Sequence, residues 1–130
     1  MRVLQPADWA RPKGYSNGIE AQGRQIFVAG QIGWNKDCVF ERHDFPGQFE
    51  QALLNIKAVL AEAGAGPEHV VRLTWFITDK KAYLSEGRRV GEIYRAVMGR
   101  NFPAMSVVQV SALIEDAALV EIEATAVIPA

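Results

Sequence analysis

The sequence predicts an α+β domain in which one mostly antiparallel sheet is covered on one face by two helices. Runs of β-branched and aromatic residues stand before, between and after two stretches of helical periodicity, and each helical stretch is long enough to cover a sheet. The expected order is β-β-α-β-α-β-β, with 1–130 forming a single domain. With 49% hydrophobic residues, the chain can build its core without disulfides or metals.

The first two strands are expected around 16–21 and over 25–32. The second run contains Ile26, Phe27 and Val28, and Gly23 predicts a turn between the two. We therefore expect these strands to pair as a hairpin.

The first helix is expected to begin after Asp44, an N-cap acceptor, with Pro46 where its missing N–H costs nothing. Its apolar stripe recurs at spacings of four, three and four residues: Phe49, Leu53, Ile56 and Leu60. The second helix is expected over 80–98 and contains Gly87 and Gly91. Each glycine costs about 1 kcal/mol relative to alanine in a helix interior, which indicates close backbone packing there.

Three further strands are expected over 70–78, 105–110 and 119–128, with a turn near Glu115. The last strand alternates between an apolar face and a mixed face, the latter carrying Glu121, Glu123, Thr125 and Val127. If the helices cover the apolar face, the mixed face must meet water or another subunit. Its composition favours a second subunit, since an exposed sheet is a liability.

The composition argues against several classes of partner. There are 14 basic and 15 acidic residues, a net charge of −1, which disfavours nucleic acids and anionic membranes. No run approaches the roughly 20 apolar residues that span a bilayer, and 1–10 lacks the apolar stretch of a signal peptide. The single cysteine, Cys38, suits a reducing compartment. We expect a cytoplasmic protein with no metal site, because His43 and His69 have no ligand-like spacing.

The residues resemble the reactive-intermediate deaminase (RidA/YjgF) family along nearly the whole chain. The resemblance rests on four segments in the family's order: PKGYSNGI, VAGQIGWN, QALLNIKAVLAEAGA and the tail NFPAMSVVQVSALIEDAALVEIEATAV. It implies a chorismate-mutase-like fold, assembled as a homotrimer with a small-molecule pocket at each subunit boundary. It also implies hydrolysis of reactive enamines or imines to a carbonyl compound and ammonia, without a cofactor.

Residue by residue, the resemblance implies that Glu121 is catalytic. It also implies that four residues contact the substrate: Tyr15, Gly30, Met105 and Val107. From the residues alone, Glu121 could equally lie on a solvated strand face, Tyr15 in a core or interface, and Gly30 in a turn. Met105 stands where the family has the arginine that holds the substrate carboxylate, and Val107 where a cysteine is frequent.

The other departures also remove polar groups or bulk. Ala29 replaces a serine and Gly91 an asparagine. These changes predict a roomier, more apolar pocket, suited to a larger aromatic or conjugated imine and no longer selective for small carboxylates. Another cation could replace the missing arginine, but Arg72 is expected to reach an interface carboxylate such as Glu121 rather than a ligand. The arginines on or near the second helix are expected to form surface pairs such as Glu92 with Arg95.

Three functions follow from these observations. The first is an enamine or imine deaminase with an altered substrate range. The second is a non-catalytic small-molecule-binding trimer on the same scaffold, and the third is a role in protein interaction. The fold alone cannot separate them, because function resides in the site.

Overall fold

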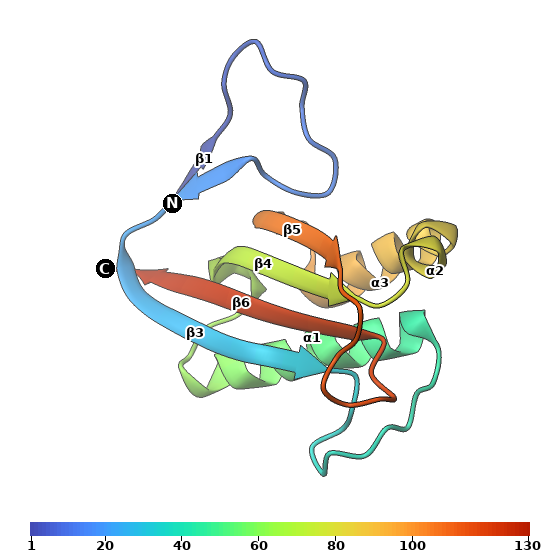
Figure 1. Ribbon diagram of the computed structural model, residues 1–130. Helices are drawn as coiled ribbons and strands as arrows, with labels where there is room; N and C mark the ends of the chain where they lie inside the picture. Colours follow the sequence, from blue (N-terminus) through green and yellow to red (C-terminus); the bar gives the residue numbers. More distant parts are fainter.

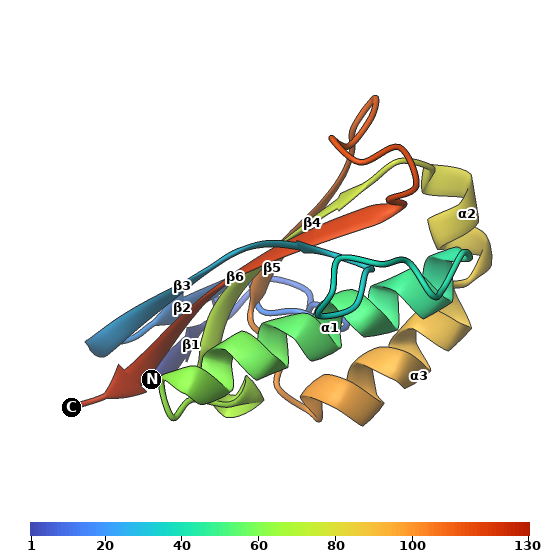
Figure 2. The same cartoon turned by 90° about the horizontal axis from the view of Figure 1, so that it is seen from below.

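The computed structural model describes residues 1–130 and contains a four-stranded sheet, a two-stranded sheet and two long helices (Figure 1). The helices α1 and α3 lie together on one face of the four-stranded sheet, and no helix covers the other face (Figure 2). The elements are β1 Arg2–Leu4, β2 Gly18–Glu20, β3 Gly23–Ile32, α1 Phe45–Glu62, a 3-10 turn Pro67–His69, β4 Val70–Ile77, α2 Lys80–Ser85, α3 Gly87–Met98, β5 Ala104–Gln109 and β6 Val120–Pro129.

The main sheet has the order β3-β6-β4-β5, with β6 inside it. β6 pairs antiparallel with both β3 and β4, whereas β5 pairs parallel with β4. A parallel pair requires a crossover connection, and α2 and α3 supply it. The prediction of an α+β fold with a mostly antiparallel sheet, covered on one face by helices, is confirmed.

The helix α1 begins and ends as its residues predict. The Asp44 carboxylate accepts a hydrogen bond from the Gly47 N–H at 2.9 Å, and a proline occupies the first turn. Beyond the helix end, Gly64 takes a positive φ of 72°, a conformation that favours glycine. The predicted apolar stripe is fully buried against the sheet: Phe49, Leu53, Ile56 and Leu60 are each 0% exposed.

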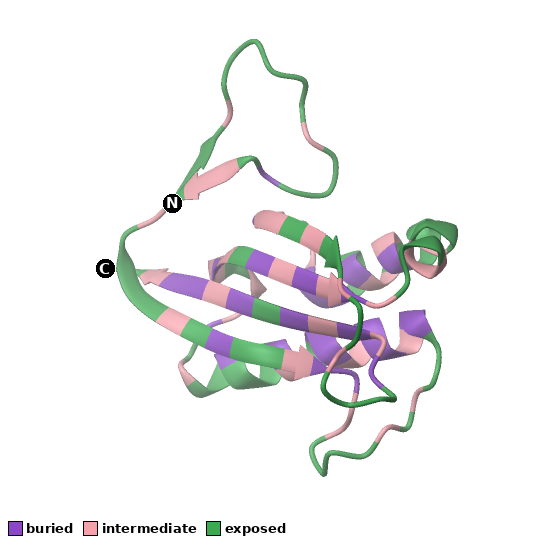
Figure 3. Ribbon diagram, viewed as in Figure 1, coloured by how far each residue is buried: buried purple, intermediate pink, exposed green.

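The alternation along β6 separates a core face from an open face. Val120, Ile122 and Ala126 are 0% exposed and belong to the core, while Glu123 is exposed. Along β6, buried segments alternate with less buried ones (Figure 3). Phe27 of β3 is 71% exposed on a neighbouring strand. The two-faced last strand is confirmed, with one difference: Val127 of the second face is buried, whereas Glu123 is left exposed within one chain.

The predicted hairpin is wrong. The strand expected around 16–21 exists as β2, but it pairs with β1, which was not predicted, through Val3 opposite Ile19. Only Ala21 and Gln22 separate β2 from β3. Two-residue hairpin turns need positive φ angles, which Gly, Asn or Asp supply and Ala-Gln does not. β3 therefore pairs with β6 instead.

The helix expected over 80–98 is divided at Glu86, which ends α2 and begins α3. Gly87 is the first residue of α3, and a Cβ added there would meet nothing within 4 Å. At Gly91 an added Cβ would meet the Arg95 guanidinium at 3.3 Å rather than another backbone. Close backbone packing is thus the wrong explanation for both glycines. Gly87 weakens the helix where it breaks.

Gln48 is a buried polar residue that fixes the start of β6. It is 0% exposed; its Nε2 donates to the Ala117 carbonyl at 2.9 Å and to the Arg42 carbonyl at 3.2 Å. The Leu119 N–H donates to its Oε1 at 2.8 Å. One side chain thus ties α1 to the segment that leads into β6.

We expect Gln48→Ala to lower the free energy of unfolding by about 2 to 3 kcal/mol, because it leaves buried backbone groups unsatisfied. Urea unfolding at one fixed protein concentration measures this. Lys57→Ala, an exposed position of the same helix, should stay within about 0.5 kcal/mol of the parent. Equal effects of the two substitutions would contradict the role of Gln48.

Candidate functional site

A cleft of about 360 Å³ lies between β5, the helices and the loop that precedes β2; we call it the β5 cleft. Tyr15, Met105 and Val107, three of the predicted substrate-binding residues, all line it. Gly91 lines it as well. The Ser16 hydroxyl donates to the Phe102 carbonyl at 2.5 Å, and this bond anchors the loop that carries Tyr15.

The walls of the β5 cleft are aromatic. Trp75 lies edge-on to Tyr83, with ring centroids 6.3 Å apart, and Tyr94 stacks on Phe102 at 5.9 Å. The Tyr94 hydroxyl donates to the Asn101 carbonyl at 2.5 Å. Burial raises the pKa of Tyr94, and to a lesser degree that of Tyr83, so both phenols stay protonated at neutral pH. The cleft therefore offers flat apolar surfaces.

Trp75 connects the core with the cleft. Its side chain is 3% exposed and packs on Phe49 with centroids 4.7 Å apart, yet it also lines the cleft. Its Nε1 is the one buried side-chain polar atom in the molecule without a hydrogen-bond partner. Leaving such a donor unpaired costs about 1 to 3 kcal/mol.

Glu121 and Gly30 lie in a different, smaller hollow of about 210 Å³, which Ile32, Trp34 and Glu115 also line. The register of β3 against β6 shifts between Val28 and Gln31, so Gly30 sits in a β-bulge. A Cβ added at Gly30 would lie 2.8 Å from the Glu121 Cδ. The bulge and the absent side chain together make room for the Glu121 carboxylate.

Glu121 and the β5 cleft lie on opposite faces of the sheet. Trp75 is paired with Ile122 on one side and Val107 on the other, so these three side chains share the helix-covered face. Glu121 precedes Ile122 and points to the open face. Two strand spacings, roughly 10 Å, also separate β6 from β5. One chain therefore brings Tyr15, Met105 and Val107 together but not Glu121 or Gly30.

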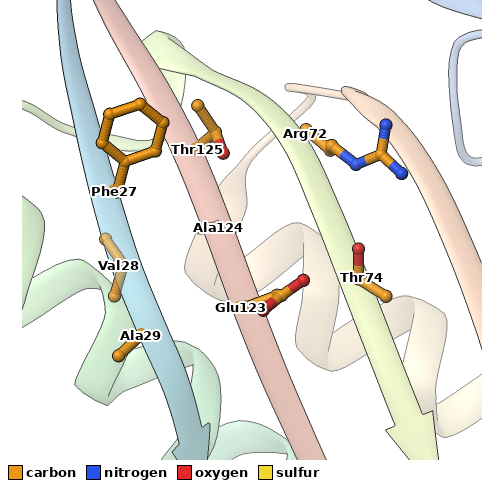
Figure 4. Close-up of a pocket in the computed structure, with 8 residues that line it drawn as sticks. All are labelled: Phe27, Val28, Ala29, Arg72, Thr74, Glu123, Ala124 and Thr125. Atoms are coloured by element: carbon orange, nitrogen blue, oxygen red, sulfur yellow. The ribbon is translucent and has the colours of Figure 1, made fainter.

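The open face carries a third hollow of about 400 Å³, lined by residues including Phe27, Arg72, Thr74 and Glu123 (Figure 4). Arg72 lies opposite Thr125 on β6, two pairs along from the Thr74–Glu123 pair and four from the Phe76–Glu121 pair. Within one chain the carboxylate that lines this hollow with Arg72 is Glu123, and a contact between Arg72 and Glu121 across a subunit interface stays a prediction. The hollow lies on the sheet face predicted to meet another subunit.

The arginines of α3 differ from expectation at one position. The predicted Glu92–Arg95 pair is wrong, because Glu92 pairs with Arg88 at 3.4 Å. Arg95 forms no ion pair and instead lines the β5 cleft. The sequence signal that could have found it is its four-residue spacing from Gly91, which places both on one helix face.

No group of three or more His, Cys, Asp or Glu side chains is placed to hold a metal ion. No helix combines the length and apolar character needed to cross a bilayer.

Known proteins match nearly the whole chain. A family model described as Endoribonuclease L-PSP matches residues 8–128. The RutC family protein UK114 of Drosophila melanogaster is 35% identical over 126 residues, 96% of this chain and 88% of that protein. YyfB of Yersinia pestis, a Rid family protein described as of unknown function, has a TM-score of 0.85 at 34% identity and covers 98% of both chains. TdcF of E. coli, solved with bound serine, has a TM-score of 0.69 at 28% identity and covers 98% of this chain and 99% of its own.

We expect Gly30→Ala to displace the Glu121 carboxylate, because the new methyl group would lie within 3.1 Å of three side-chain atoms of Glu121. A crystal structure of the variant should show Glu121 in another rotamer. Gly87→Ala, where an added Cβ meets nothing within 4 Å, is the matched control and should leave Glu121 in place. An unmoved Glu121 in Gly30→Ala would refute the steric role of this glycine.

Proposed function

Because this chain belongs to the RidA/YjgF family, we propose that it hydrolyses a reactive enamine or imine to a carbonyl compound and ammonia. The observation that carries the proposal is the room that the bulge at Gly30 makes for the Glu121 carboxylate. A carboxylate with space beside it can accept a proton from water, which is the main chemical requirement of this hydrolysis.

The reaction balances without a cofactor. Water adds to the C=N carbon and forms the C–O bond while Glu121 accepts the proton that water loses. That proton passes to the nitrogen and gives a carbinolamine. The hydroxyl proton of the carbinolamine then moves to the nitrogen as the C–N bond breaks, so ammonia leaves and the C–O bond becomes a carbonyl group. No electrons are gained or lost overall, so the protein needs to supply only orientation and proton transfer.

The proposed active unit is a homotrimer whose neighbouring subunits complete each site. Glu121 and the β5 cleft lie on opposite faces of the sheet in one chain, so a single copy cannot use both on one substrate. The uncovered sheet face, with Phe27 71% exposed, and Ile114, 99% exposed beside the Glu121 hollow, supply apolar surface for contact. The Glu121 hollow of one copy would then face the β5 cleft of the next, with the substrate between subunits.

A second candidate, a non-catalytic small-molecule-binding trimer, is favoured by Met105. A bidentate arginine contact with a carboxylate is geometrically specific, and methionine cannot make it. The apolar walls around Tyr15, Trp75 and Phe102 would then bind a ligand without turning it over. Met105 in place of the arginine favours binding without catalysis, whereas the presence of Glu121 favours hydrolysis. Both functions are therefore tested below.

RNA cleavage, which the description of the matching family model suggests, is a weaker candidate. Binding an RNA backbone depends on several phosphate contacts from basic side chains. The net charge of this chain is −1, and the β5 cleft holds only two cations among its aromatic walls.

We place the protein in the cytoplasm, because its one thiol, Cys38, is exposed and suits a reducing compartment.

We expect the parent protein to release 2-oxo acid from freshly generated 2-imino acids, with a preference for bulky side chains. Glu121→Gln should lower kcat roughly 100- to 10,000-fold, the usual contribution of a general acid or base. Glu123→Gln changes a carboxylate two residues along the same strand and should retain activity. A parent protein inactive on every imine would favour the binding trimer.

Mixed trimers test whether two subunits share a site. Glu121→Gln removes the carboxylate that one subunit contributes to the proposed site. Val107→Trp fills the β5 cleft that the neighbouring subunit contributes. After co-refolding at equal amounts, random assembly should restore about one quarter of parental activity, because each site combines two independently drawn copies. If the separately folded variants are inactive and the mixture stays inactive, a site shared between subunits is excluded.

A further inference from the structure

The β5 cleft has a charge pattern that Met105 alone does not predict. Two cations, Lys13 and Arg95, line it, and no acidic side chain does. Neither cation forms an ion pair elsewhere in the chain; the nearest acidic residue on α3, Glu92, pairs with Arg88. A cleft with unpaired positive charge and no carboxylate of its own attracts an anionic ligand.

The position of Arg95 depends on Gly91. A Cβ added at Gly91 would lie 3.3 Å from Nη1 and 3.8 Å from Nη2 of Arg95. The guanidinium therefore lies over the glycine, one helical turn back along α3, where a longer side chain at position 91 would compete for the space. Gly91 and Arg95 together give the cleft a cation that comes from the helix.

The volume and the aromatic walls of the β5 cleft indicate which kind of anion fits it. At about 360 Å³ it is large for a two- or three-carbon acid and comparable with small-ligand pockets in general. Trp75, Tyr94 and Phe102 present ring faces and edges to the cavity. Aromatic rings pack well against such walls in offset or edge-to-face arrangements.

We infer that Arg95 binds the carboxylate of an aromatic 2-imino acid in the β5 cleft, in place of the arginine that position 105 lacks. The two departures at Met105 and Gly91 then have one explanation. The cation moves from the strand to the helix, the space at Gly91 admits it, and Met105 adds apolar wall beside the aromatic ring. Carboxylate selection is retained, in contrast to the expectation from Met105 alone, and the pocket takes a longer substrate. The inference rests on the proposed function for the identity of the reacting group.

Binding of a reaction product tests Arg95 without requiring turnover. The probes are phenylpyruvate, its methyl ester and pyruvate, titrated calorimetrically into the intact parent protein. We expect phenylpyruvate to bind more tightly than either of the other two. Arg95→Gln should weaken phenylpyruvate binding about 10- to 150-fold, which is the effect on affinity of losing one charged hydrogen bond. The affinity for the methyl ester should not change. Arg88→Gln, on the same helix but paired with Glu92, is the matched control and should bind as the parent does.

A second variant separates lost charge from lost folding. Met105→Arg in the Arg95→Gln background should restore phenylpyruvate binding, because it returns a guanidinium to the cleft. Gly91→Asn should weaken binding by crowding the Arg95 guanidinium. Equal loss for acid and ester, or no loss, in a folded Arg95→Gln protein would overturn the inference.

The outcomes for the two proposals are distinct. If the parent protein binds phenylpyruvate through Arg95 but hydrolyses no imine, the deaminase proposal fails while the assignment of Arg95 stands. If it hydrolyses imines and Arg95→Gln lowers kcat/KM equally for the acid and its ester, the assignment of Arg95 fails while the deaminase proposal stands.

Discussion

The strict alternation of side chains along β6 is the constraint on which the rest of the structure depends. This strand pairs on both of its edges, with β3 and β4, so its two faces define the two faces of the whole sheet. Ile122 and Ala126 hold α1 against one face, while Glu121 and Glu123 project from the other. A shift of one residue in register would bury the carboxylates and expose the core. The packing that stabilises the fold therefore also fixes the side on which Glu121 can act.

Local patterns were sufficient for most of the fold. The helix α1 could be predicted because its cap, its apolar spacing and its stop lie within one segment, and each strand of the main sheet has its own β-branched run. The pairing of β2 with β1 could not, because it depends on competition between distant partners. The break at Glu86 was also missed: glycine weakens a helix but does not by itself decide between a break and a continuous turn.

The candidate site, like the fold, could be predicted from the sequence only in part. Tyr15, Met105 and Val107 line one cleft, since β5 carries two of them on one face, and their contact with a substrate stays a prediction. Residue patterns assigned Arg95 to the surface, because its spacing from Glu92 fits an ion pair. Arg88 takes that partner instead, at 3.4 Å, and Arg95 turns over Gly91. Spacing in the sequence does not determine whether Glu92 pairs with Arg88 or with Arg95. The side-chain geometry shows that Arg88 forms the pair and that Arg95 forms none.

The position of β6 also has a consequence for how the chain can be made. It is the last strand in sequence but an inner strand in space, so β3 and β4 have no common partner until residues 120–129 have been synthesised. During translation the nascent chain would carry α1 and two unpaired strand edges, which are prone to stick to one another. The main sheet can close only after β6 has left the ribosome. Folding of the main sheet is thus held back until these residues are available, and a ribosome that stalls before residue 120 would leave a chain that cannot join β3 to β4.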